Sequence, residues 1–445
     1  MTAAPLRLLE LPGDIRVIGA EADFEDIELD PPFVISGRPM THLTAATIRL
    51  TVRTREGRPG HGWGAGILSV PWSWPRSTLS LDERDRIMRD LVRALAARLV
   101  ELAGTGDPFT LWRPLEAELP AVLETAARRL RVDAIPPLAG LLALGAIDNA
   151  LHDAWSRTAG RSPYEMYTRE HLNQDLGWVM PGLAGTHPGD HLGPRRSDLP
   201  VQHALGVGDP LQAAAGDQGA VGPAGLEDWI RTEGIAHLKL KLAGDPSRDA
   251  QRIAEVHELA GHRPGATVSL DPNEAYSVEA LEQMLDELSA RSRGAAAAIT
   301  YLEQPFLRDT TVEPGRMARL TSRFPVLMDE GYSDLAQLAT LQEQGWSGVV
   351  IKAAKGQSHA LVTLAAARTL GLRVAIQDLT TVGAALEHSL GLGAEIGADW
   401  PQIEYNSRQY AAAANARLAV RRPELVLVRD GHVRADRVPL GLYSS

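Results

Sequence analysis

Six ionisable residues recur at nearly even intervals in the second half of the chain. They are Lys241, Asp271, Glu303, Asp329, Lys352 and Asp378, and the intervals between them are 30, 32, 26, 23 and 26 residues. Each interval has the length of one strand, one helix and two short loops, and each residue stands at or near the end of a strand-like run. Since the carboxyl ends of barrel strands form one rim, we expect these side chains to lie together there.

Three of the six are carboxylates from adjacent predicted strands. Asp271, Glu303 and Asp329 supply hard oxygen donors, which Mg²⁺ prefers. Three carboxylates that meet without a cation would repel one another, and some would have to stay protonated. The chain has no cysteine and no histidine pair at ligand spacing, which disfavours a zinc site. We therefore predict a Mg²⁺ site.

The lysines provide the second half of the chemistry. In the run 236–242 the strand period of two places Lys239 and Lys241 on one face and three leucines on the other, so the lysines should point into the barrel. An interior ammonium beside another cation has a lowered pKa, as a general base requires. Lys352 is four strands further on, across the mouth. Removal of the proton next to a carboxylate needs a base on one face and a dication that stabilises the enediolate. The group on the opposite face can return a proton or stabilise charge while a leaving group departs.

Eight short apolar runs alternate with helix-like stretches from residue 199 to residue 406. The runs are 199–205, 236–242, 267–271, 298–304, 325–330, 348–353, 373–378 and 401–406. This alternation predicts an α/β protein with a parallel sheet, and eight units favour a closed TIM-type (β/α)8 barrel over an open doubly wound sheet. The first run is the weakest assignment, since the count demands it.

The remainder of the chain predicts a second domain. The run 45–55 reads as a half-buried strand with an antiparallel partner at 15–30, and 82–103 and 115–130 read as helices. We divide the chain into an α+β capping domain (1–145), the barrel (146–420, with a loop insertion at 172–198) and a tail (421–445). The tail has a hairpin signal at Asp430-Gly431 and is expected to return to the cap.

Composition limits the possible partners. The net charge is −11, which argues against nucleic acid or an anionic membrane. No run reaches the roughly 20 apolar residues of a membrane span, and the start of the chain lacks the apolar core of a signal peptide. We expect a soluble cytoplasmic protein that acts on a small molecule.

The motifs together resemble the enolase superfamily, specifically its mandelate racemase/muconate lactonizing enzyme family and the muconate lactonizing enzyme-like branch. The matching elements are K-x-K (239–241), Asp271 with Asn273, YLEQP (301–305), MDEG (328–331), IKAAKG (351–356) and AIDNALHDAW (146–155). The superfamily's lysine base with Mg²⁺ is a known pairing. The resemblance implies a modified (β/α)7β barrel with a cap completed by the tail, and usually a homo-oligomer.

The resemblance also implies a role for each site residue. Asp271, Glu303 and Asp329 would bind Mg²⁺, and Lys241 and Lys352 would be the two acid–base groups. Lys239 would help to hold the carboxylate of a small-molecule substrate and lower the pKa of Lys241. Asn273 and Glu330 would support the metal ligands, and Lys355 would either do the same or lie on the surface.

Departures from the family pattern reduce the number of reactions and substrates that fit the sequence. The mandelate racemase branch carries a histidine at the end of strand seven and an aspartate on strand six, whereas this chain has Gln377-Asp378 and Lys352. Dipeptide epimerases usually carry Asp-x-Asp after strand eight to hold an ammonium, but Glu404 is the single acid in 403–406, which disfavours a dipeptide. Asp378 is either a further acid–base group or an ion-pair partner of Lys352.

Several reactions stay open. We favour racemisation or epimerisation over dehydration of an acid sugar or related hydroxy acid, and over cycloisomerisation. A non-catalytic relative is a remote alternative, which the complete set of lysines and carboxylates opposes. A metal-dependent hydrolase would need a His-x-His pair on strand one, and only His203 is present there.

Other polar and aromatic residues are expected to cover the site, to lie at the surface or to support the fold. Trp63, Trp72 and Trp74, together with the segment 20–40, are candidates to cover the barrel mouth. Four residues of the 172–198 insertion are expected mainly at the surface, with contact to the substrate or to a neighbouring subunit as the alternative; they are His187, His191, Arg195 and Arg196. Asp148 and Asp153 should form caps or ion pairs.

Overall fold

The N-terminal part is an antiparallel sheet flanked by helices. The computed structural model describes residues 9–35, 38–212, 225–438 and 440–444. Strands β1 (Ile15–Ile35), β2 (Arg38–Thr54), β3 (Pro59–Leu68) and β4 (Thr105–Gly106) form a sheet of order β3-β2-β1-β4. Ile15 lies opposite Thr54, which confirms the predicted pairing of 15–30 with 45–55. The helices that follow are α1 (Val70–Ser73), α2 (Leu81–Leu102), α3 (Pro108–Leu130) and α4 (Pro137–Ala159).

The predicted parallel barrel is present. Its strands are β5 (Asp198–Leu205), β6 (His237–Lys241), β7 (Thr267–Asp271), β8 (Ile299–Glu303), β9 (Val326–Met328), β10 (Gly348–Lys352), β11 (Arg373–Gln377) and β12 (Ile403–Glu404). Each strand from β5 to β11 pairs in parallel with the next. The ring closes because β12 pairs with β5 and Ala375 bridges to Trp400 just before β12.

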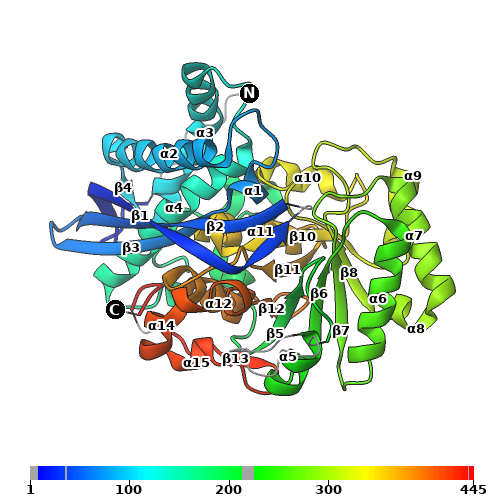
Figure 1. Cartoon of the computed structure of the whole chain (residues 1–445). Helices are drawn as coiled ribbons and strands as arrows, with labels where there is room; N and C mark the ends of the chain where they lie inside the picture. Colours follow the sequence, from blue (N-terminus) through cyan, green and yellow to red (C-terminus); the bar gives the residue numbers. More distant parts are fainter. Residues whose placement is uncertain (1–8, 36–37, 213–224, 439, 445) are drawn as a thin grey trace.

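A helix follows each of the first seven strands and leads to the next strand, which gives the (β/α)7β form. The helices between the strands are α5 (Leu226–Glu233), α6 (Pro246–Ala260), α7 (Val278–Arg291), α8 (Arg293–Ala297), α9 (Pro314–Thr321), α10 (Leu338–Leu341), α11 (Gln357–Thr369) and α12 (Ala384–Ile396). Figure 1 shows α6, α7 and α8 on the outside of β6, β7 and β8, and the cap strands beside helix α4. Within the described residues no helix is long and apolar enough to cross a membrane.

Leucine and lysine alternate on β6 as the sequence predicts. Leu238, Leu240 and Leu242 are buried in the main hydrophobic core, whereas Lys239 and Lys241 point to the interior of the barrel. A separate small cluster of apolar side chains fills the barrel below them, consisting of Tyr301, Leu327, Val350 and Ala375. The barrel is therefore a packed core with charged groups at one end only.

Two expectations about the cap helices need adjustment. Helix α3 begins at Pro108 rather than near 115, because the Asp107 carboxylate accepts a hydrogen bond from the Thr110 amide at 2.9 Å and caps the helix. Helix α4 runs through the proposed boundary between residues 145 and 146. The division into three parts remains a prediction.

The tail differs from the predicted hairpin. The first half of the expected hairpin contains a short helix, α15 (Pro423–Val426), after α13 (Ser407–Tyr410) and α14 (Ala416–Arg421). A single bridge between Arg429 and His432 surrounds the Asp430-Gly431 turn, and β13 (His432–Arg434) pairs with the barrel strand β5. The chain reaches the cap later, where the Tyr443 hydroxyl accepts a hydrogen bond from the Ala65 amide at 3.0 Å.

Close packing between β3 and α4 fixes the cap to the barrel. A Cβ atom added to Gly64 would lie 1.9 Å from the carbonyl oxygen of Ala146 and 2.5 Å from the amide nitrogen of Ala150. We expect Gly64→Ala to lower the free energy of unfolding by about 1–3 kcal/mol or more, because both obstructing atoms belong to a helix backbone. Urea unfolding measures the loss, with Gly208→Ala as the control, since among the described residues beyond its chain neighbours no atom lies within 4 Å of a Cβ there. Equal stability of the two variants would show that the contact can relax.

Candidate active site

The barrel mouth gathers five of the predicted residues from five neighbouring strands. Lys241 Nζ lies 2.5 Å from Asp271 Oδ2, and Lys352 Nζ lies 3.1 Å from Asp329 Oδ2. Glu303 lies between the two pairs, with Oε1 3.9 Å from Lys352 Nζ. All five side chains come from the carboxyl ends of β6 to β10. The predicted assembly of lysines and carboxylates is therefore present, although their chemical roles remain to be tested.

Lys239 lies beneath this layer. Its ammonium is fully buried and contacts three carboxylates at 2.9–3.1 Å, those of Asp271, Glu303 and Glu404. It does not line the cavity at the mouth. In this structure Lys239 is therefore paired with carboxylates below the cavity, and its roles toward the substrate carboxylate and the pKa of Lys241 stay predictions.

Lys355 and Trp72 surround the Lys352 side. Lys355 Nζ donates to the backbone carbonyls of Asp329 at 2.9 Å and Tyr332 at 3.0 Å, and lies 3.3 Å from Asp329 Oδ1. The Lys352 and Lys355 ammonium groups lie 5.1 and 5.6 Å from the Trp72 ring centre. Lys355 is therefore a buried support of Asp329 and not a surface residue.

The remaining candidates lie around the same cluster. Asn273 donates its side-chain N–H to Glu330 at 2.9 Å, and its backbone N–H to Asp271 at 3.0 Å. Asp378 accepts from the Leu379 amide at 2.7 Å, and its carbonyl oxygen, not its carboxylate, lies 3.2 Å from Lys352 Nζ. The ion pair between Asp378 and Lys352 considered from the sequence is consequently not formed.

Burial and charge shift the pKa values of these groups in opposite directions. Burial and the neighbouring Asp271 raise the pKa of Glu303 well above its usual value. Burial also raises the pKa of Glu330, to about 7, with Asp329 adding to the shift. Burial alone would lower the pKa of Lys352, but Asp329 beside it raises it overall. This differs from the lowered pKa expected for a base, because uncompensated carboxylates hold the proton on the lysine.

The donor set fits a hard dication, although the ligands are not prearranged around one. Among the described residues no group of three or more His, Asp or Glu side chains already has the geometry of a metal site. However, Asp271, Glu303 and Asp329 are three buried carboxylates that lie close together, and the neighbouring Asp271 adds to burial in raising the pKa of Glu303. A bound Mg²⁺ would compensate this mutual repulsion, and carboxylate oxygens are the ligands that Mg²⁺ prefers. Asp271, Glu303 and Asp329 are the residues that would hold it.

A small cavity of about 20 Å³ lies above the lysines. Lys241, Lys352, Asn273, Glu404 and Asp378 form its barrel side, together with three neighbours that the sequence did not single out, Leu379, Thr380 and Asn406. Thr380 has a φ of +58°, a backbone conformation that β-branched residues rarely adopt. No local sequence signal indicates such a conformation, so Thr380 could not have been predicted.

The cap closes the cavity with a few apolar side chains. Phe33, Met40 and Trp72 line it, together with Ser69. The segment 20–40 and Trp72 are thus confirmed as cover for the mouth. Trp63 is 41% exposed beside Arg157, and Trp74 is buried in the main core, so neither covers the cavity.

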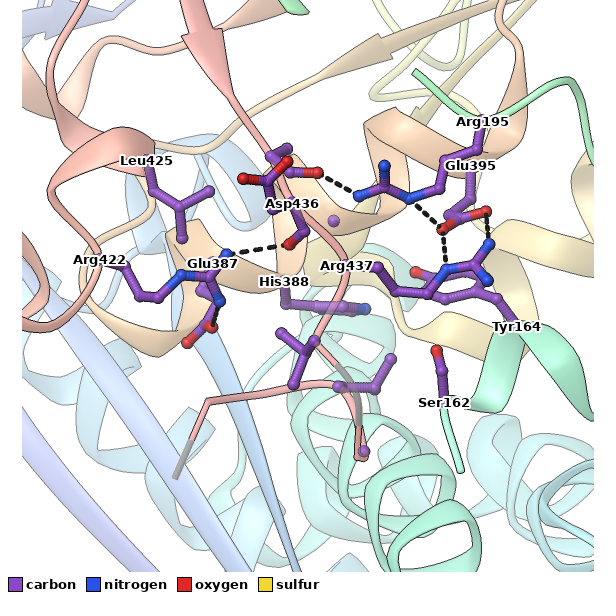
Figure 2. A pocket seen from close by; sticks show the side chains of 15 residues that line it. Ser162, Tyr164, Arg195, Glu387, His388, Glu395, Arg422, Leu425, Asp436 and Arg437 are labelled. Atoms are coloured by element: carbon purple, nitrogen blue, oxygen red, sulfur yellow. Dashed lines mark hydrogen bonds and ion pairs between the residues drawn. The ribbon is translucent and has the colours of Figure 1, made fainter. Parts of the chain in front are cut away.

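The 172–198 insertion lies at the opposite end of the barrel. Arg195 pairs with Glu395 at 3.0 Å, and Glu395 also binds Arg437 of the tail, as Figure 2 shows. Glu395 stands at the end of α12, which returns to the amino ends of the strands. His191 contacts Thr186 at 3.0 Å within the insertion itself. None of the residues 172–198 lines the cavity at the barrel mouth, so the structure shows no route from this segment to the proposed site.

Lysine usage across the whole chain supports the importance of this site. The chain has 45 basic residues, of which four are lysines and 41 are arginines, and the four lysines are Lys239, Lys241, Lys352 and Lys355. Arginine cannot lose its proton near neutral pH, whereas lysine can. All four lysines of the chain therefore lie at this site, next to the acidic cluster formed by Asp271, Glu303, Asp329 and Glu404.

A closed parallel barrel with a capping sheet and lysines facing carboxylates at its mouth defines a class of barrel proteins. Residues 224–442 match the sequence model of the family described as "Enolase C-terminal domain-like". With this match and the barrel in agreement, the chain belongs to the enolase superfamily.

Solved structures with this fold cover nearly all of the chain. A dipeptide epimerase from Enterococcus faecalis, complexed with Mg and L-Leu-L-Tyr, has a TM-score of 0.62 at 15% identity, over 96% of this chain and 99% of that one. The L-Ala-D/L-Glu epimerase of Bacillus subtilis has 0.62 at 16% identity, over 96% and 98%. A muconate lactonizing enzyme from Pseudomonas fluorescens has 0.58 at 19% identity, over 96% and 95%. At these identities the likeness establishes the fold.

One curated relative is similar over part of the chain. A probable DNA ligase from Pseudarthrobacter chlorophenolicus is 33% identical over 226 residues, which are 49% of this chain and 37% of that protein. The chain thus spans little more than a third of that relative's length.

Proposed function

We propose that the protein is a Mg²⁺-dependent enzyme that removes the α-proton of a small carboxylate substrate. The observation that carries this proposal is the position of Lys241 and Lys352, which line one cavity from strands four apart, with Asp271, Glu303 and Asp329 next to them. The superfamily membership and the Mg-bound relatives of the same fold support it.

The side chains at the cavity have different roles in the proposed reaction. Mg²⁺, when bound, supplies positive charge that stabilises the enediolate oxygens. One lysine, as the free amine, takes the α-proton, and the other, as an ammonium, returns a proton to the same carbon from the opposite side. Phe33, Met40 and Trp72 exclude water from this space. The product is the other stereoisomer, so we favour racemisation or epimerisation within the muconate lactonizing enzyme-like branch.

The charge pattern at β12 opposes a dipeptide substrate. Glu404 is engaged by Lys239 at 3.1 Å and accepts from Asn406 at 3.3 Å, so its charge is already compensated. No second acid follows it in the run Ile403–Glu404–Tyr405–Asn406. We therefore expect a substrate without a free ammonium group near β12, such as an N-acyl amino acid or a hydroxy acid.

Elimination of water is a second candidate, which Asp378 favours. Asp378 is one of the residues that line the cavity with Lys352, and burial raises the pKa of its carboxyl group to about 6. A carboxyl group with such a pKa can donate a proton to a leaving hydroxyl while Lys352 removes the α-proton. In substrates with a hydroxyl on the β-carbon, loss of water would then compete with return of the proton.

The test is exchange of the α-proton with solvent deuterium. The Mg²⁺-loaded protein is incubated in D₂O with N-acyl amino acids, hydroxy acids and sugar acids, and NMR follows the α-proton signal. We expect exchange in at least one class, with inversion for a racemase or a keto-acid product for a dehydratase. Absence of exchange in all classes would refute the proposal.

A further inference from the structure

Two buried aspartates outside the acidic cluster hold the backbone next to each lysine base. Asp148 lies on α4, which precedes the barrel, and Asp249 lies on α6, which follows β6. Both side chains are at most 1% exposed. Each accepts hydrogen bonds from the segment directly after one lysine-bearing strand, and neither lines the cavity.

Asp148 binds the segment after Lys352. Its two oxygens accept from the amide and the hydroxyl of Ser358, each at 2.6 Å. Its neighbour Asn149 accepts from the Gln357 amide at 2.9 Å. These contacts cap the first turn of α11, which begins five residues after Lys352. Gly356, with φ of +104°, leaves the space that the Asp148 carboxylate needs, since a Cβ there would lie 2.6 Å from Asp148 Oδ2.

The charge of Asp148 is directed at this helix alone. No lysine or arginine nitrogen lies within 4.0 Å of it in the described chain, and its one basic neighbour is His152 at 3.5 Å. A carboxylate is stabilised by the partial positive charge of a helix N-terminus. Helix α4 also packs tightly against the turn between Lys352 and α11, because a Cβ on Gly145 would lie 2.2 Å from the Ala354 carbonyl oxygen.

Asp249 has the equivalent position on the other side. Its oxygens accept from the Ala243 amide at 3.0 Å and the Gly244 amide at 2.9 Å, which lie two and three residues after Lys241. The Tyr276 hydroxyl donates to it at 2.6 Å. The two bases therefore have separate anchors that share no residue.

We propose that Asp148 and Asp249 are positioning residues, each dedicated to one base: Asp148 fixes Lys352 and Asp249 fixes Lys241. This inference rests on the proposed two-base function. Since the two lysines act on opposite faces of the substrate carbon, each anchor controls exchange in one stereoisomer. A base displaced by about 1 Å loses on the order of 100-fold in rate.

The test compares stereoisomers in the Mg²⁺-loaded full chain. Lys241→Ala and Lys352→Ala first establish which stereoisomer each lysine serves. Asp148→Asn is then expected to slow deuterium exchange at least about 10-fold in the stereoisomer whose α-proton Lys352 removes. The exchange rate of the other stereoisomer should stay within about 2-fold of the wild-type rate. Asp249→Asn is expected to give the reverse pattern. Equal losses in both stereoisomers for either variant would overturn the proposal, because they indicate general destabilisation.

Milder variants keep the test valid if an asparagine variant fails to fold. Ser358→Ala removes one hydrogen bond to Asp148, and Tyr276→Phe removes one to Asp249. They should show the same opposite asymmetry at smaller size. If neither changes the ratio of the two exchange rates, the anchors do not position the bases.

Lysine NMR gives a readout that needs neither metal nor substrate. With labelled lysine the protein has four side-chain signals, which Lys→Arg variants assign. Asp148→Asn should shift the signals of Lys352 and Lys355, and Asp249→Asn that of Lys241. Shifts in this pattern with no exchange in the wild type would refute the proposed function alone. Exchange in the wild type without the pattern would refute the anchors alone.

Discussion

Lys241→Ala and Lys352→Ala are each expected to reduce the interconversion of stereoisomers by about 1,000-fold. Each variant lacks the group that removes or returns the proton on one face of the carbon. The remaining lysine still exchanges the α-proton of one stereoisomer with solvent, so the two variants should lose exchange in opposite stereoisomers. Polarimetry measures interconversion, and NMR in D₂O measures exchange in each isomer.

Controls separate this loss from unfolding or loss of metal. Neither lysine is a metal ligand in the proposed site. Mg²⁺ binding, measured by calorimetry, should therefore persist in both variants. Since all four lysines lie at the site, the matched control is an exposed arginine, Arg319→Ala, which should retain wild-type rates. Full activity in either lysine variant would show that the replaced lysine takes no part in the mechanism.

The periodic part of the fold was predictable because the signal is repeated. Eight apolar runs at regular spacing each specify a strand, and a residue at the end of a parallel strand has a defined place on the rim. Asp271, Glu303 and Lys352 end β7, β8 and β10, and Asp329 follows β9 by one residue. Even the uncertain first run proved to be β5, which closes the ring through β12.

Features that depend on contacts between distant segments were not predictable. The run at 424–428 alternates as a strand would, yet it has no partner strand, and its first residues form α15. Asp148 was correctly expected to form a cap, but periodicity cannot show that the capped helix is α11, some 200 residues later. The position of Lys239 likewise depends on Glu404, which reaches it from the last strand of the barrel.

The distribution of lysine along the sequence also indicates the site. A count of lysines identifies the site directly, since four lysines among 45 basic residues all belong to two short motifs, K-x-K and K-x-x-K. The physical reason is that a guanidinium can replace an ammonium in most surface ion pairs but cannot serve as a base near neutral pH.

Removal of Mg²⁺ is expected to abolish exchange completely, and its return should restore it. In the structure Asp329 raises the pKa of Lys352 against the effect of burial, so the lysine keeps its proton at neutral pH. A dication bound by Asp329 would compensate that carboxylate and lower the pKa of Lys352. Exchange by the loaded protein should therefore increase with pH, as the base loses its proton.

Proton release provides a second measurement of the same coupling. Burial and Asp271 raise the pKa of Glu303 well above its usual value, which favours its protonated form when no cation is bound, whereas only the ionised carboxylate is a metal ligand. Mg²⁺ binding at pH 7 should therefore release protons, which calorimetry in buffers of different ionisation enthalpy counts. Glu303→Gln should bind Mg²⁺ more weakly and release fewer protons. Mg²⁺ binding without proton release would show that Glu303 is already ionised before the metal binds. Exchange by the chelated protein would show that the metal is not needed for the reaction. Either result would contradict the proposed arrangement.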